Sequence, residues 1–567
     1  MGPSVERVRR AYRRLAEVDR PEVWISVRDQ ADAEREAELL DARAAAGRTL
    51  PLHGVVLAVK DNIDVAGMPT TGAFPGAFRP AEVDATAVSR LRAAGAVVIG
   101  KTNLDQFATG LVGTRSPYGA VRNARRPELI SGGSSSGSAV AVALGVVDIA
   151  LGTDTAGSGR VPAALNGIVG VKPTLGLVSA VGMMPACRPY DTITVFAQEL
   201  STAIRTARTM TGPDAVDPLS RDWPADVRLA GSPRPVLGVP SDDDLDSLEP
   251  FALAAWRDAL DRLTEHAELR PIEMAPLLGA AKLLYEGAIV AGRFHAAGEH
   301  VEGASGDAAG LDPTVAGIVR DARDVAGWEY VRDRAEIDRI AVLARELLAG
   351  CECLVVPTAP AHPTIAAVRA DPVALNARMG TFTNFVNLLD MSAVSVPAAS
   401  TDDGEFGITF IARAFDDQLA VDAAARFLGV PAEPYAETWP HVAVFGAHLR
   451  GQPLNDELVA LGARFARDVL TADEYQLYAL DTTPQKPGLV RVGPGGSAIA
   501  GELWSISPAG LGAFLSALRA PMTLGSVTLA NGEEVVGFGC EPRALEGAKD
   551  ITSFGGWRAY RASLGAV

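Results

Sequence analysis

Two loops rich in glycine and serine contain residues that could attack a carbonyl carbon. Residues 131–138 read SGGSSSGS, and residues 152–160 read GTDTAGSGR. The first loop continues into the apolar segment Ala139–Leu144, which predicts a helix whose first N–H groups stabilise developing negative charge. Glycines on both sides of Ser158 let the backbone approach a carbonyl and present N–H groups to it. The pattern indicates a serine nucleophile beside an oxyanion hole.

A lysine that ends an apolar segment is the candidate base. Lys60 follows the apolar residues of GVVLAVKDNID, residues 54–64. A lysine accepts a proton only when it is neutral, and burial lowers its pKa from about 10.4, whereas an arginine stays charged. The chain has six lysines and 46 arginines, so a lysine here fits a need for an amine that can lose its proton. Lys101 and Lys172 lie in the same region, and we expect them to be structural.

Residues 131–138 have two other interpretations. Sequence rich in glycine and serine is usually a flexible linker, but the apolar helix that follows argues against a linker. A phosphate-binding loop would continue into Gly-Lys-Ser or Gly-Lys-Thr, and neither follows. We therefore expect a catalytic loop rather than a nucleotide site.

The composition argues against several other classes of function. The chain has 69 acidic and 52 basic residues, and a net charge of −17 repels nucleic acids and anionic membranes. No run of about eighteen apolar residues predicts a membrane span, and the arginine-rich N-terminus is unlike an export signal. The seven histidines lack the spacing of metal ligands, so we expect no metal, and we expect no other cofactor because acyl transfer to serine and then to water requires none. The four scattered cysteines fit a reducing cytoplasm.

The order of the apolar segments predicts an α/β fold with a second, smaller domain. We expect strands at Val55–Val59, Ala96–Ile99, Val147–Leu151 and Leu354–Pro357, and helices at Ala85–Ala94 and Ser136–Leu144. A proline-rich stretch, residues 431–440, precedes new strand-like sequence and marks the expected domain boundary. We therefore predict a catalytic domain over residues 1–430 and an α+β domain over residues 441–567.

Three sequence blocks resemble the signature of the amidase-signature family, namely GVVLAVKDNID, SGGSSSGS and GTDTAGSGRVPAALNGIVGVKPT. The resemblance covers about residues 5–430 and implies a central mixed sheet surrounded by helices. It implies that Ser158 is the nucleophile, that Ser134, in a cis peptide, relays the proton, and that Lys60 is the base. It also implies an oxyanion hole formed by the N–H groups of Thr155, Ala156, Gly157 and Ser158.

Longer stretches are similar to the allophanate hydrolases within that family. These stretches are DQFATGLVGTRSPYG at 105–119, the run 159–191, FGAHLRGQPLN at 445–455 and DITSFGGWRAYRA at 550–562. The resemblance implies hydrolysis of allophanate, a small anionic amide, with Tyr285 and Arg293 holding the substrate carboxylate. Residues eight apart lie about 12 Å apart along a straight helix, so the two side chains would have to converge. The alternative is an ordinary core tyrosine and a solvated arginine.

The C-terminal region loosely resembles γ-glutamyl cyclotransferase-like domains. In allophanate hydrolases this domain is linked to assembly and to processing the first product, N-carboxycarbamate, so that ammonia and carbon dioxide result. His448 is the candidate residue for this step, and Glu502 is a weaker one, although a single histidine beside a strand is often structural. The resemblance implies a cytoplasmic homodimer and leaves open a urea carboxylase as a pathway partner.

Two other functions use the same residues. An amidase acting on malonamate, biuret or glutamine would share Lys60, Ser134 and Ser158. One such enzyme is the glutaminase component of tRNA-dependent amidation, but that component lacks this tail, and the acidic chain shows no sign of RNA contact. A non-catalytic scaffold of the same fold would retain the three residues by accident.

Overall fold

The chain divides into two compact units. The computed structural model describes residues 2–76, 78–303, 310–436 and 439–565. The first unit consists of Met1–Asp222 and Arg234–Tyr435, and the second consists of Trp223–Pro233 and Ala436–Val567. The boundary expected at residues 431–440 includes 437–438, which lie outside the described residues. The second unit thus also takes a short segment from the middle of the chain, which the sequence did not predict.

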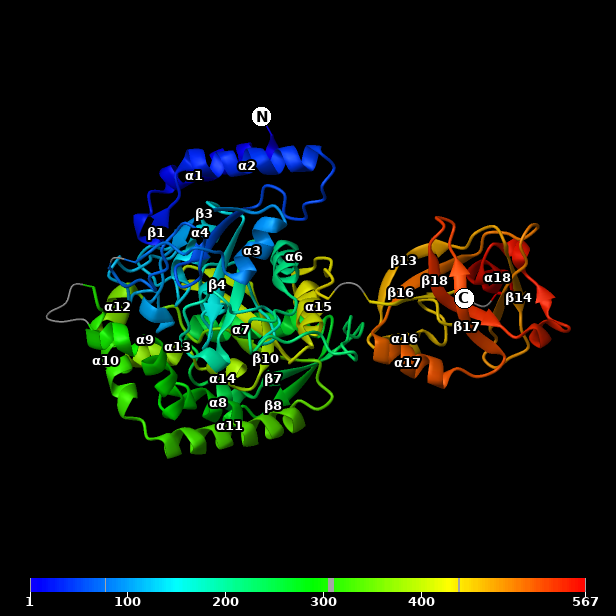
Figure 1. The fold of residues 1–567 in the computed structure, drawn as a ribbon. Helices are drawn as coiled ribbons and strands as arrows, with labels where there is room; N and C mark the ends of the chain where they lie inside the picture. The colour runs from blue at the N-terminus through cyan, green and yellow to red at the C-terminus, as the bar shows by residue number, and fades with distance from the viewer. Residues whose placement is uncertain (1, 77, 304–309, 437–438, 566–567) are drawn as a thin grey trace. The chain divides into compact units, whose positions relative to one another are not determined.

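A mixed β-sheet runs through the first unit (Figure 1). Among the described residues its strand order is β1-β3-β2-β4-β6-β5-β10-β11-β9-β7-β8. β2 pairs in parallel with β3 and β4, β7 pairs in parallel with β8 and β9, and the other neighbours are antiparallel. The strands are β1 (Trp24–Val27), β2 (Val56–Lys60), β3 (Val97–Thr102), β4 (Ile149–Asp154), β5 (Val169–Lys172), β6 (Thr192–Ala197), β7 (Val236–Pro240), β8 (Glu268–Ile272), β9 (Cys353–Pro357), β10 (Met391–Thr401) and β11 (Gly404–Arg413).

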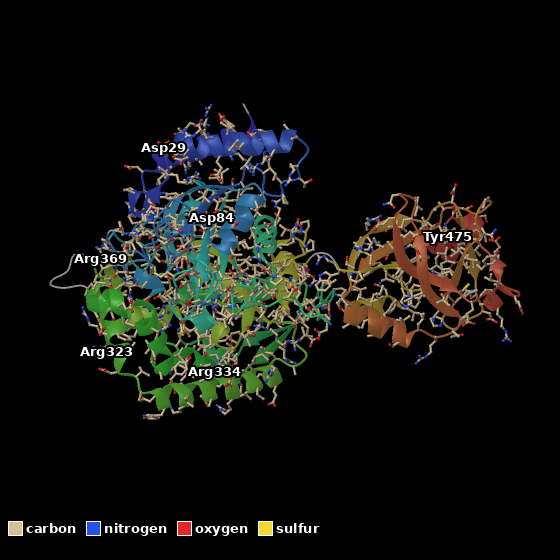
Figure 2. All side chains as sticks on the ribbon, in the orientation of Figure 1. Asp29, Asp84, Arg323, Arg334, Arg369 and Tyr475 are labelled. Atoms are coloured by element: carbon tan, nitrogen blue, oxygen red, sulfur yellow. The ribbon has the colours of Figure 1, made fainter. Side chains whose placement is uncertain are left out.

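Helices surround this sheet, which confirms the predicted fold class (Figure 1). They are α1 (Pro3–Val18), α2 (Gln30–Ala45), α3 (Thr86–Ala93), α4 (Ser136–Ala143), α5 (Val161–Leu165), α6 (Leu200–Met210), α7 (Pro250–Thr264), α8 (Ala275–Leu283), α9 (Ala291–Gly303), α10 (Pro313–Asp321), α11 (Gly327–Leu347), α12 (Ile365–Ala370), α13 (Ala374–Met379), α14 (Asn384–Leu388) and α15 (Asp417–Leu428). Figure 2 labels Asp29, whose carboxylate accepts the N–H groups of Ala31 and Asp32 and so caps α2.

Two strands and one helix determine where the chemistry can take place. Every residue of β2 and of β4 is buried, which explains why both strands are nearly continuous apolar runs. α4 begins directly after the serine-rich loop, and it is buried because its residues are small: serine, glycine, alanine and valine. The predicted strand and helix positions around residues 54–160 are therefore confirmed to within a few residues.

The second unit is a smaller α+β fold. Among its described residues one sheet has the order β13-β16-β12-β18-β17, and another has the order β15-β14-β19. Its strands are β12 (His441–Val444), β13 (Arg464–Leu470), β14 (Tyr475–Ala479), β15 (Pro487–Arg491), β16 (Ala500–Ser505), β17 (Met522–Thr528), β18 (Glu534–Cys540) and β19 (Lys549–Asp550), and its helices are α16 (Asn455–Ala460), α17 (Pro508–Ala517) and α18 (Trp557–Ser563). Segment 223–233 joins this unit, since Leu229 N–H donates to the Gly462 carbonyl at 2.8 Å. Val227 and Leu229 are buried.

Candidate active site

Lys60, Ser134 and Ser158 meet at one edge of the first unit's sheet. Lys60 ends β2, Ser158 lies in the loop after β4, and Ser134 lies just before α4. β2 and β4 are parallel neighbours, so their carboxyl ends lie at the same edge. Lys60 Nζ lies 2.8 Å from Ser134 Oγ, which lies 3.0 Å from Ser158 Oγ. The structure thus joins the three predicted residues in one buried chain of hydrogen bonds.

The surroundings of Lys60 favour a neutral amine. Burial lowers the pKa of Lys60 to about 7, although nearby carboxylates act in the opposite direction. Its Nζ also donates to Thr153 Oγ1 at 2.7 Å, and Asn62 Nδ2 donates to the same oxygen at 3.3 Å. When the amine is neutral and donates to Thr153, its lone pair is left for the hydroxyl of Ser134. Neither Thr153 nor Asn62 was predicted as a site residue, although both lie within the signature blocks.

A buried aspartate lies against the backbone before Ser134. The Gly133–Ser134 peptide bond is cis, as predicted. Asp105 is buried beside it and accepts the N–H groups of Gly113 and Arg115 at 3.0 and 2.9 Å. A Cβ atom on residue 133 would collide with the Asp105 carboxylate, so this position requires glycine. Burial raises the pKa of Asp105 above its ordinary value.

A buried ion pair fixes the loop that carries Ser158. Asp154 accepts the N–H of Gly159 at 2.9 Å and two hydrogen bonds from the Arg160 guanidinium at 2.9 and 3.0 Å. Burial acts to raise the pKa of Asp154, but the charge and hydrogen bonds of Arg160 outweigh it and hold the pKa below its ordinary value. This pair was not predicted, although two opposite charges six residues apart around a glycine-rich loop are a signal for it in the sequence.

Gly157 has to be removed from the predicted oxyanion hole. Its N–H donates to Asp154 Oδ1 at 2.9 Å and is therefore not free for a substrate. The N–H groups of Thr155, Ala156 and Ser158 have no acceptor among the described residues and remain candidates. Gly157 has φ of +136°, and a Cβ atom there would collide with Thr383, so glycine serves the backbone rather than the oxyanion.

Tyr285 and Arg293 converge, because the helix between them is broken. α8 ends at Leu283 and α9 begins at Ala291, so the spacing of a straight helix does not apply. Arg293 donates to the Tyr285 hydroxyl at 3.0 Å and to the Ala108 carbonyl at 3.0 Å. Only 2% of Arg293 is exposed, so the alternative of a solvated helix residue is wrong. The charge of Arg293 also contributes to the lowered pKa of Lys60, which places it near the triad.

A carboxylate from α11 holds the break between α8 and α9. Asp333 Oδ2 accepts the N–H of Ala288 at 2.6 Å, and Asp333 is buried. A side chain on Gly287 would meet this carboxylate oxygen at 2.6 Å. Burial acts to raise the pKa of Asp333, but its hydrogen bonds with Arg332 and Ala288 outweigh burial and lower the pKa. Asp333 therefore positions the turn that carries Tyr285.

His448 and Glu502 lie in separate groups of contacts in the second unit. His448 Nε2 lies 2.9 Å from Glu457 Oε2, and its ring stacks on Phe538 with centroids 4.9 Å apart. Burial lowers the pKa of His448, although Glu457 acts to raise it. Glu502 is fully buried and accepts hydrogen bonds from Arg450, Arg558 and Trp504. These partners satisfy Glu502 without a ligand.

The described part of the chain contains neither a candidate metal site nor a candidate membrane-spanning helix. No group of three or more His, Cys, Asp or Glu side chains within it could hold a metal ion. Within it, too, no helix is both long and apolar enough to cross a membrane.

Comparison with known proteins identifies the family. The family described as Amidase matches residues 6–421. The chain belongs to the amidase family. The family described as Allophanate hydrolase C-terminal domain matches residues 440–562, so this amidase carries a second recognised domain.

Relatives of this amidase differ in how much of the chain they share. The solved structure of Kluyveromyces lactis allophanate hydrolase is 36% identical with a TM-score of 0.88, and the match covers 100% of this chain and 97% of that one. Urea amidolyase of Saccharomyces cerevisiae is 40% identical over 95% of this chain but only 31% of its own length. A glutamyl-tRNA(Gln) amidotransferase chain of Roseiflexus castenholzii is 34% identical, with coverage of 71% of this chain and 88% of its own length. The chain therefore spans about a third of the length of the curated urea amidolyases that it matches.

Proposed function

We propose that this amidase hydrolyses allophanate to ammonia and N-carboxycarbamate. The observation that carries the proposal is the buried Arg293, which donates to the Tyr285 hydroxyl and whose charge contributes to the lowered pKa of Lys60. A guanidinium and a hydroxyl are suited to a carboxylate, and allophanate has its carboxylate one nitrogen away from the amide that is cut. The likeness to Kluyveromyces lactis allophanate hydrolase over both units supports the same assignment.

Acylation begins with a proton transfer along the buried chain. With Lys60 neutral, the Ser134 hydroxyl donates to Lys60 Nζ, and the Ser158 hydroxyl donates to Ser134 Oγ. Ser158 Oγ then bonds to the urea carbonyl carbon of allophanate, and its proton passes through Ser134 to Lys60. The N–H groups of Thr155, Ala156 and Ser158 stabilise the oxyanion.

The intermediate collapses by the reverse proton transfer. Lys60 returns its proton through Ser134 to the amide nitrogen, the C–N bond breaks, and ammonia leaves. Lys60 then acts again as the base: water attacks the carbonyl carbon of the acyl group on Ser158, and N-carboxycarbamate is released. The residues named supply every proton that these steps require, so no cofactor is needed.

Substrate turnover by matched variants tests this function. Ammonia release would be measured with allophanate, malonamate, biuret and glutamine, in wild type and in Ser158→Ala, Ser134→Ala and Lys60→Ala. We expect allophanate to be preferred and each variant to lose turnover with an unchanged circular dichroism spectrum. Double variants should lose little more than the worst single one, because the residues act as a unit. A folded Ser158→Ala variant that retains turnover would contradict the nucleophile assignment.

The second unit has a separate proposed role, the processing of N-carboxycarbamate at His448. His448 and Lys486 lie in the wall of the same small cavity of about 20 Å³, which holds about one water molecule, so the support from Lys486 is that its positive charge would attract an anionic product. The test is ammonia yield per allophanate in His448→Ala, which should fall while the first ammonia is still released. An unchanged yield would make His448 structural.

We also propose a cytoplasmic homodimer that acts after a urea carboxylase. All four cysteines are free, which supports a reducing compartment. The urea amidolyase relatives, whose length extends well beyond the match, support a carboxylase as pathway partner. The oligomeric state is tested by light scattering after size exclusion, where a monomer mass would contradict the dimer.

A further inference from the structure

We propose that the anionic substrate reaches the active site through a cavity beside Tyr285 and that Lys282 attracts it there. This inference rests on the proposed function. The cavity has a volume of about 530 Å³ and is lined by residues from α8, from the α13–α14 region and by Arg115. It is large enough for allophanate, and nothing in the mechanism above uses it.

Two residues of the cavity wall link it to the active site. Tyr285 lines it, and the Tyr285 hydroxyl accepts the hydrogen bond from Arg293. Asn384 also lines it, and the preceding residue, Thr383, is the one that a side chain on Gly157 would strike. A molecule in the cavity therefore meets Tyr285 of the proposed carboxylate clamp, and one residue, Thr383, separates Asn384 of the wall from the contact with the loop that carries Ser158.

Polar atoms in its wall lack protein partners. Asn384 is 7% exposed, and its Oδ1 atom has no hydrogen-bond partner among the described residues. The same holds for Nε of Arg115, which is 2% exposed. Buried polar atoms are normally satisfied, but both of these atoms are shielded from solvent, so an occupant of the open cavity would bond to them only after the two side chains turn toward it.

Lys282 gives the cavity its positive charge. It lies on the last turn of α8, is exposed, and has no carboxylate partner among the described residues. The other cations of the cavity are less available: Arg378 pairs with Glu249 at 3.2 Å, and Arg115 donates to main-chain carbonyls. Glu286 also lines the wall, and because Arg378 is paired with Glu249, the positive charges that outnumber Glu286 are those of Lys282 and Arg115.

A second cavity near the nucleophile loop does not offer such a charge. It has a volume of about 220 Å³ and is lined by three arginines and three aspartates. Two of its arginines pair with its own aspartates, Arg188 with Asp217 and Arg221 with Asp390. An anion would therefore gain little free energy of binding in the second cavity. Because the whole chain has a net charge of −17 and repels anions, the unpaired positive charge beside Tyr285 favours that cavity as the route for the substrate.

The test measures binding without turnover. Malonamate, an anion that has a methylene in place of the allophanate nitrogen, would be titrated calorimetrically into the full-length Ser158→Ala protein and into double variants that also carry Lys282→Ala, Lys282→Glu or Lys282→Arg. Removing one exposed charge should weaken binding about two- to fivefold, and reversing it should weaken binding more. Lys282→Arg should bind like the parent. Added salt should weaken binding in the parent more than in Lys282→Ala, because salt screens the attraction.

Two controls separate this inference from its alternatives. Malonamide, which is neutral, should bind all variants equally, and Lys549→Ala, which removes an exposed lysine of the second unit, should not affect malonamate. Equal malonamate affinity in the parent and Lys282→Ala, or equal loss in Lys549→Ala, would overturn the inference. Failure of the wild type to hydrolyse allophanate would overturn the proposed function instead, and the binding result would still decide the role of Lys282.

Discussion

With Lys60 as the proposed base, we expect the chemistry of this site to depend on pH. Burial lowers its pKa to about 7, and only the neutral amine accepts the proton of Ser134. We therefore expect kcat/KM for allophanate to rise with pH and to level off above pH 7, since this ratio reports the free enzyme. A pH–rate profile from pH 5.5 to 9 checks this. A rate that is independent of pH over this range would contradict a lysine base.

The same burial destabilises the fold. The unfolded chain keeps Lys60 protonated up to about pH 10.4, whereas the folded protein loses that proton near pH 7, so the unfolded state binds more protons between these values. At pH 7 this difference in pKa lowers the free energy of unfolding by on the order of 4 kcal/mol, and Lys60→Met would remove that loss. Lys60→Met should raise the melting temperature at pH 6–7, and its advantage should shrink toward pH 9. Calorimetry at both ends of the range measures the change, and an advantage that grows with pH would contradict the buried, neutral lysine.

Arg293 should affect kcat/KM for charged substrates but not for neutral ones. If it holds the carboxylate in both ground and transition states, Arg293→Ala should raise KM more than it lowers kcat, with a loss of about 2–5 kcal/mol in kcat/KM. Arg293→Lys should show a smaller loss in kcat/KM, because lysine keeps the positive charge but lacks the planar guanidinium that binds a carboxylate through two hydrogen bonds. Hydrolysis of neutral malonamide should barely change. Equal factors for charged and neutral substrates would make Arg293 structural.

At the scale of elements, the sequence predicted the strands and helices whose positions depend on local patterns of apolar residues. β2, β4 and α4 followed from apolar runs and from the loop composition between them, and their arrangement brings Lys60, Ser134 and Ser158 together. The break between α8 and α9 did not follow, because residues 283–297 are compatible with one helix. It depends on a carboxylate more than forty residues later in the chain, and such tertiary contacts override local preference.

Asp333 is therefore expected to control substrate affinity from outside the site. Asp333→Leu removes the acceptor of the Ala288 N–H and should let the turn move, which separates Tyr285 from Arg293. KM for allophanate should rise severalfold while kcat changes less. Hydrolysis of malonamide should be nearly unchanged, since it does not use the clamp. A general loss of activity on both substrates, with a lowered melting temperature, would show that Asp333 supports the fold as a whole.

At the scale of the whole molecule, the candidate functional residues fall in two units. The triad, the three candidate oxyanion donors, the clamp and the cavity beside Tyr285 all belong to the first unit. His448 and Glu502 belong to the second. The sequence indicated a change of character at residues 431–440, but it gave no sign that segment 223–233 leaves the first unit, because a loop rich in proline has no periodic pattern that reveals its packing partner.

Because segment 223–233 belongs to the second unit, it affects where the chain can be cut in an experiment. Ending the chain at residue 436 removes the partners of segment 223–233, so Val227 and Leu229, which are buried in the intact chain, would be exposed. We expect such a protein to aggregate. Replacing 223–233 by a glycine–serine linker of equal length in the same truncated chain should restore solubility and leave the first ammonia release from allophanate intact, because no residue assigned to that step is lost. Solubility, circular dichroism and ammonia release measure the three outcomes, and a folded, linker-bearing protein without ammonia release would mean that the second unit shapes the first site.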